Sequence, residues 1–70
     1  MDDYQDYIQK LSPRKKEFVG AVDFFEDDMG RHAVDIKTGA YGTWWRHILI
    51  YDKTNKRIKV ITYKTGGYRS

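Results

Sequence analysis

Two histidines and one run of acids are the residues of this chain best suited to acid–base or metal chemistry. His32 and His47 lack the paired spacing of metal ligands, and the acidic run at 26–28 lacks the spaced ligands of a calcium loop. There is no cysteine nucleophile, and the serines, Ser12 and Ser70, stand beside a proline and at the chain end. A domain of this size also encloses little of the water-excluding volume that catalysis needs. The sequence therefore predicts a protein that is not an enzyme, with no catalytic residue, no metal site and no cofactor.

Two glycine-containing segments have the composition of phosphate-contacting loops. They read Gly39-Ala40-Tyr41-Gly42 and Lys64-Thr65-Gly66-Gly67. Neither opens a helix after a strand, as the nucleotide-binding motifs require. Both are predicted to be turns, in which glycine supplies a positive φ.

The charges of this 70-residue chain are divided unevenly along its length. Residues 1–35 carry nine acidic and five basic side chains, a net of −4, whereas residues 36–70 carry one acidic and eight basic side chains, a net of +7. Two interpretations stay open. Either the basic half meets an acidic surface of a partner, or the two halves neutralise each other within the fold.

Aromatic rings are interleaved with the cations of the basic half. They are Tyr41, Trp44, Trp45, Tyr51, Tyr63 and Tyr68. Rings on a sheet stack on unpaired bases while Lys and Arg neutralise phosphates, which favours nucleic-acid binding. Trp, Tyr and Arg are also the residues most enriched at the energetic centres of protein interfaces, which favours protein binding. Trp45 and Tyr51 are predicted to belong to the core.

The first element expected is a helix at about residues 3–11. Tyr4, Tyr7, Ile8 and Leu11 recur at the spacing of one helical stripe. Pro13 follows, and the residue before a proline is pushed out of the helical region.

Four strands are expected after it, at about 18–25, 31–37, 44–51 and 57–64. The last two are rich in aromatic and β-branched residues and flank a polar turn, which predicts a β-hairpin. Residues 13–29 are ambiguous, because their apolar residues also share one helical face. The strand is preferred, since the Phe, Val and Gly of this segment are poor helix formers.

A short motif recurs along the chain. Lys37-Thr38-Gly39-Ala40-Tyr41 is echoed by Lys64-Thr65-Gly66-Gly67-Tyr68, 27 positions later. Two similar hairpins would produce this pattern, and chance explains it equally well.

The alternation of side chains assigns the faces of the second hairpin, if Asp52 and Arg57 close a four-residue loop. The first face holds Trp45, His47, Leu49, Tyr51, Ile58, Val60 and Thr62. The second face holds Trp44, Arg46, Ile48, Ile50, Arg57, Lys59, Ile61 and Tyr63. The helix is expected to cover the first face. The second is then either curled into a barrel-like interior or exposed for interaction.

These elements predict one α+β domain, residues 1–70, in which an N-terminal amphipathic helix packs on a curved four-stranded antiparallel sheet in meander order. Neither a signal peptide nor a membrane-spanning run is visible, and cysteine is absent. We therefore expect an intracellular, cytoplasmic protein without a membrane partner. Pairing of two chains as a homodimer stays open.

The function expected is stoichiometric binding to a larger protein that itself handles nucleic acid. A basic chain of 70 residues has the general character of the accessory proteins of phages and mobile elements, such as inhibitors of restriction or CRISPR nucleases. Direct nucleic-acid binding through a basic, aromatic sheet face is the alternative. The predicted contact residues are Trp44, Arg46, Lys53, Lys56, Arg57, Lys59, Tyr63, Lys64, Tyr68 and Arg69.

Overall fold

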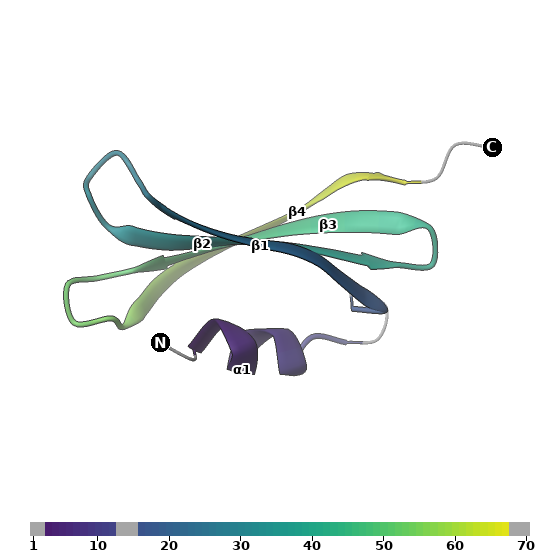
Figure 1. Ribbon diagram of the computed structural model, residues 1–70, viewed down its shortest axis with the longest axis horizontal. Coiled ribbons are helices and arrows are strands. Elements are labelled where there is room, and N and C mark those ends of the chain that lie inside the picture. The colour runs from purple at the N-terminus through teal and green to yellow at the C-terminus, as the bar shows by residue number, and fades with distance from the viewer. Residues whose placement is uncertain (1–2, 13–15, 68–70) are drawn as a thin grey trace.

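The structure is a computed structural model that describes residues 3–12 and 16–67. Within these residues it contains one helix and four strands: α1 (Asp3–Gln9), β1 (Phe18–Glu26), β2 (His32–Ala40), β3 (Thr43–Tyr51) and β4 (Arg57–Gly67). The strands form one antiparallel sheet in the order β1-β2-β3-β4, and α1 lies against one side of it (Figure 1). The predicted α+β fold, a helix on a meander of two hairpins, is confirmed. β1 and β4 are the two edges of the described sheet, which stays open.

Helix α1 forms at the predicted amphipathic stretch. Asp6 lies in its first turn, where a carboxylate suits the positive end of the helix dipole, and Lys10 Nζ lies 3.0 Å from Asp6 Oδ2. The helix ends at Gln9, after which the amide of Leu11 donates to the carbonyl of Ile8 (3.1 Å), a bond of the tighter 3₁₀ kind. Within the described part of the chain, no helix has the length and apolar character needed to cross a membrane.

The ambiguous segment is a strand. β1 pairs with β2 along its length, with Val22 opposite Ile36. The helical alternative is therefore wrong for residues 16–29, and residues 13–15 lie outside the described part. Pairing satisfies the backbone groups and brings Val22 against the core, which outweighs the helical spacing of the apolar residues. A bulge at Gly20 interrupts the pairing.

The turns at 27–31 and 52–56 share one backbone plan. In each, the amide of the first residue donates to the carbonyl of the last (2.9 Å), and the amide of the fourth donates to the carbonyl of the first (3.0 Å). Oδ1 of the leading aspartate accepts the amides of the third and fifth residues. The fourth residue has a positive φ, 76° for Gly30 and 64° for Asn55, which Gly and Asn adopt more readily than other residues.

The expected closure of the second hairpin by Asp52 and Arg57 is wrong. Arg57 pairs with Tyr51, which leaves five residues in the turn. A bulge at Ile58 then restores the predicted register, with Lys59 opposite Ile50. The aspartate-capped turn is one residue longer than expected, and the bulge absorbs the difference.

The two glycine-containing segments behave differently. Tyr41 and Gly42 form the two-residue β2–β3 turn with φ of 54° and 79°, the positive values that such tight hairpin turns require. The prediction of a turn at 64–67 is wrong, because that stretch lies inside β4. The repeated motif and the repeated turn also do not coincide, since the two turns lie 25 positions apart and the motif copies 27.

The core lies between the sheet and α1. Its buried cluster is Val34, Ile36, Leu49 and Tyr51, with Tyr4, Tyr7, Ile8 and Val22 packed against it. His47 is also fully buried; its Nε2 lies 2.8 Å from Thr38 Oγ1 and its Nδ1 lies 3.1 Å from Tyr7 Oη. The helix therefore joins the sheet through apolar packing and through a partly buried hydrogen bond from Tyr7 to His47.

Candidate binding surface

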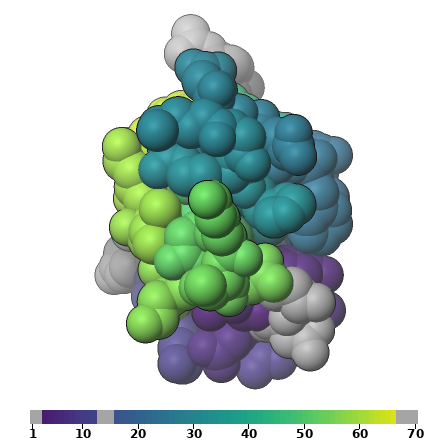
Figure 2. Space-filling view, turned by 90° about the vertical axis from the view of Figure 1, so that its left-hand side faces the viewer, coloured from purple at the N-terminus to yellow at the C-terminus, as the bar shows by residue number. Residues whose placement is uncertain are grey.

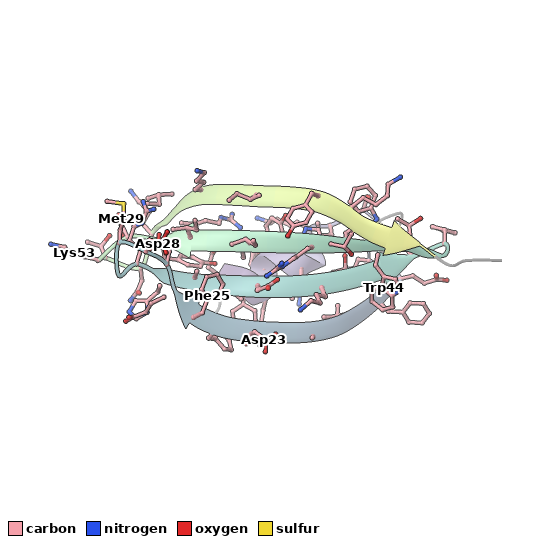
Figure 3. All side chains as sticks on the ribbon, turned by 90° about the horizontal axis from the view of Figure 1, so that it is seen from above. Asp23, Phe25, Asp28, Met29, Trp44 and Lys53 are labelled. Atoms are coloured by element: carbon pink, nitrogen blue, oxygen red, sulfur yellow. The ribbon has the colours of Figure 1, made fainter. Side chains whose placement is uncertain are left out.

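The open face is the side of the sheet that α1 does not cover (Figure 1). It is viewed from above in Figure 3, where Trp44 lies toward the β2–β3 turn and Phe25 toward the other end. Strand alternation and the register place these residues, among others, on it: Asp23, Phe25, Asp35, Lys37, Trp44, Arg46, Ile48, Lys59, Ile61 and Tyr63. This face carries Trp, Phe, Tyr and Arg, which are enriched in the middle of protein interfaces, beside Lys and Asp, which are more usual at the rim.

Arg46 is held in place at the centre of the open face. Its Nε donates to both carboxylate oxygens of Asp35 (3.0 and 2.8 Å), and its Nη1 donates to Tyr63 Oη (3.0 Å). Asp35 is 5% exposed. The hydrogen bonds to Asp35 and Tyr63 raise the pKa of Arg46 above its ordinary value, so the guanidinium remains charged at any pH at which the protein is folded.

The Trp44 ring lies against Gly39 of the neighbouring strand β2 and reaches Gly20 of β1 beyond it. A Cβ atom at Gly39 would lie 2.9 Å from the Trp44 ring, and one at Gly20 would lie 3.1 Å from it. Only a residue without a side chain allows this close approach at Gly39. Phe18 and Trp44 line a shallow depression beside the β2–β3 turn. The glycines thus fix where the largest ring of the open face lies.

The structure brings four of the predicted contact residues together on the open face. They are Trp44, Arg46, Lys59 and Tyr63. Tyr63 is 40% exposed, Lys59 is exposed and Trp44 is partly buried. Of the two arrangements expected for this side of the sheet, the structure shows the exposed one and not a barrel-like interior.

Arg57 is not part of this group, and its predicted place on the second face is wrong. The bulge at Ile58 turns Arg57 toward α1, where its guanidinium lies 5.2 Å from the centre of the Tyr7 ring and Nη1 lies 3.5 Å from Asp3 Oδ2. Lys64 also lies on the helix side, with Nζ 6.0 Å from the centre of the Trp45 ring.

Lys53 and Lys56 lie in the β3–β4 turn, at the end of the molecule shown in Figure 2. This turn (green) projects between the β1–β2 hairpin (blue to teal) and α1 (purple). Both lysines are exposed. The other two predicted contacts, Tyr68 and Arg69, lie outside the described residues.

Sequence reasoning missed Asp35 and Gly39, which position the open face. The signal that would have found them is the two-residue turn at Tyr41–Gly42. That turn fixes the β2–β3 register, which sets Gly39 directly opposite Trp44 and Asp35 diagonally across from Arg46.

The side chains of the open face can bind a partner through apolar contacts, hydrogen bonds and ion pairs. In the described part of the chain, no group of three His, Asp or Glu side chains is placed to hold a metal ion. Comparison with known proteins finds no match to a family model, to a curated protein or to a solved structure. The functional proposal below therefore rests on the geometry of the open face.

Proposed function

We propose that this protein acts without catalysis, by binding a larger protein through its open face. The observation that carries the proposal is the adjacency of Trp44, Arg46 and Tyr63 on the side of the sheet that α1 leaves uncovered. Trp, Arg and Tyr are the residue types that contribute most energy at protein interfaces. Together they form a rigid cluster at the middle of this face.

Preorganisation supports the same conclusion. Immobilising a long side chain costs about 0.5–1.5 kcal/mol on binding. Asp35 and Tyr63 already hold Arg46, and Gly39 already holds the ring of Trp44. Much of the ordering that a partner would otherwise impose is therefore complete before it arrives.

The cations around this cluster indicate the chemistry of the partner. Lys37 lies opposite Arg46 on the open face, with its Nζ 3.9 Å from Asp23 Oδ2, and Lys59 lies on the same face opposite Ile50. Lys53 and Lys56 lie in the β3–β4 turn. A positive rim favours a partner whose own surface is acidic around an apolar patch. Enzymes that cleave or copy nucleic acids carry clustered carboxylates for their metal ions. We infer that the partner is such an enzyme and that this protein inhibits it, as phage and mobile-element inhibitors act on restriction or CRISPR nucleases.

Plasmid cleavage by a panel of restriction and CRISPR nucleases, titrated with this protein, tests the proposal. We expect one enzyme class to lose activity at a stoichiometric ratio. Tyr63→Ser and Gly39→Arg should each weaken inhibition about tenfold or more, the first by removing an exposed ring and the second by displacing Trp44. Tyr41→Ser, which removes a 72% exposed ring at the β2–β3 turn, is the matched control and should inhibit normally. Equal inhibition by all four proteins would exclude the open face.

Direct nucleic-acid binding is favoured by one feature, the exposed lysines along the β4 side of the molecule. Lys56, Lys59 and Lys64 are exposed there. Against it, the guanidinium groups of Arg46 and Arg57 are engaged by carboxylates. Tryptophan fluorescence during titration with single-stranded DNA, duplex DNA and RNA separates the two functions. Direct binding predicts saturable quenching with a log K against log salt slope of roughly −0.7 to −0.9 per phosphate contact, whereas protein binding predicts no response.

A further inference from the structure

β1 is an edge of the sheet with few of the usual protections. Proteins commonly guard such an edge with charged residues, especially lysine, with proline, with β-bulges or with a very short strand. β1 runs for nine residues without lysine or proline, and all but one of them, Val22, are exposed. Phe18, Val19, Phe24 and Phe25 are 41–65% exposed. One bulge, at Gly20, is its only irregularity in the pairing with β2. Its outward backbone groups and apolar side chains are therefore open to another strand.

The two edges of the sheet carry opposite charges. The charged residues of β1 are Asp23 and Glu26, both exposed, and those of β4 are all basic, with Lys59 and Lys64 exposed. Figure 3 shows Asp23 on the β1 edge, with β4 along the other side of the sheet. A strand that adds to β1 should therefore carry cations.

We propose that the edge of β1 binds the edge of β4 of a second copy of this chain. Neighbouring strands of the meander run in opposite directions, so β4 of one copy meets β1 of the next antiparallel when the two sheets continue in the same orientation. Both helices then lie on the same side of the extended sheet. The contact is head to tail, because each copy uses a different edge at each of its two ends.

Two requirements set the register of this contact: opposite charges should pair, and paired side chains should lie on the same side of the sheet. With Asp23 opposite Lys59, Val22 lies opposite Val60 and Ala21 lies opposite Ile61. Asp23 and Lys59 are both on the open face, and Val22 and Val60 both face the helix side, so each pair meets on one side of the sheet. Opposite charges and apolar groups are thereby matched in neighbouring rows.

Between two copies, a β1–β4 contact fits better than a β1–β1 contact. A β1–β1 contact joins two edges whose charged residues are all acidic, so it offers no opposite-charge pair. The β1–β4 pair instead joins the acidic edge to the basic one. This self-association goes beyond the proposed inhibitory function and does not depend on it, because it uses the edges of the sheet.

Charge exchange tests this contact. Sedimentation velocity from about 10 μM to about 1 mM should show concentration-dependent association of the wild-type protein, in the range of weak interfaces. Asp23→Lys and Lys59→Glu should each weaken it about tenfold. An equimolar mixture of the two variants, and the double variant Asp23→Lys/Lys59→Glu, should associate again, because each regains an opposite-charge pair. Asp28→Lys and Lys53→Glu, which make the same charge changes at exposed turn positions, are the controls and should associate as the wild type does.

Three results would overturn the proposal: a wild-type protein that stays monomeric throughout, a Lys59→Glu variant that associates normally, or a mixture that fails to recover. Normal association of Lys59→Glu would indicate a β1–β1 contact. Circular dichroism confirms that each variant is folded before its association is compared.

Disulfide trapping tests the register. The chain has no cysteine, so introduced ones report on this contact alone. Mixing Ala21→Cys with Ile61→Cys under mild oxidation should give a covalent dimer, because directly opposite residues have Cβ atoms about 4.5–5.5 Å apart. Mixing Ala21→Cys with Thr54→Cys, a turn position, should not. Equal yields in the two mixtures would contradict the register.

Discussion

Asp35 decides how Arg46 is presented on the open face. Its carboxylate is buried and accepts hydrogen bonds from the guanidinium at 2.8 and 3.0 Å. We expect Asp35→Ala to lower the free energy of unfolding by about 1–3 kcal/mol, because a buried charge-assisted pair is lost. Urea unfolding measures the loss, with Asp28→Ala at an exposed turn position as the control. A midpoint that does not move would show that the pair is not structural.

Tyr51 should make the free energy of unfolding fall as the pH rises in the alkaline range. Burial raises the pKa of its phenol above the ordinary value, and the hydrogen bond donated to Asp3 (2.7 Å) raises it further. Since the folded pKa exceeds the unfolded pKa of about 10, the stabilisation is complete below that pH and is lost as pH rises toward the folded value. Urea midpoints from about pH 8 to about pH 11 should fall more steeply for the wild type than for Tyr51→Phe. Parallel curves would contradict this assignment.

At the scale of elements, the turns at 27–31 and 52–56 have the same backbone hydrogen bonds, so their fourth residues should tolerate the same substitutions. Gly30 and Asn55 both have a positive φ in equivalent places, and a Cβ at Gly30 meets nothing within 4 Å. We expect Gly30→Ala to cost about 1 kcal/mol through backbone strain alone, and Gly30→Asn to cost clearly less, because asparagine tolerates this conformation. Urea unfolding of both variants measures the difference. Equal losses would show that the two turns are not equivalent.

Local patterns predict these elements better than the contacts between them. Strand alternation and polar turns are local, and they place Trp44 and Tyr63 on one face. The aspartate-capped turn and the bulge at Ile58 are not visible in alternation, and a one-residue shift reverses a side chain, so the pattern misplaces Arg57. The pair Asp35–Arg46 joins two strands, and it depends on a register that composition alone does not give.

At the scale of the whole molecule, the structure supports neutralisation between the two halves of the chain, and the partner interpretation stays a proposal. Asp3 with Arg57 and Asp35 with Arg46 neutralise each other across the two halves of the chain. Lys53, Lys56 and Lys59 are exposed in β4 and its turn, where the proposed partner could contact them.

One phenol connects α1 to the two C-terminal strands. Tyr7 Oη lies 3.1 Å from His47 Nδ1 and 3.2 Å from Thr62 Oγ1. We expect Tyr7→Phe to lower the free energy of unfolding by about 1–2 kcal/mol, because both hydrogen bonds are lost. Tyr4→Phe is the matched control, since that hydroxyl contacts Gln5 at 3.5 Å in an exposed position. Equal urea midpoints for the two variants would show that the hydrogen bonds of Tyr7 do not stabilise the fold.

The meander also sets the order in which the chain can assemble. Each strand pairs with its neighbour in sequence, so the sheet closes only short loops and these contacts form quickly. The hydrogen bonds of Tyr7 instead join residues 40 and 55 positions apart, and that of Tyr51 to Asp3 joins residues 48 apart. During synthesis α1 precedes every strand, yet its partners in β3 and β4 are made last. We therefore expect the hydrogen bonds that tie α1 to β3 and β4 to form after the strands have paired.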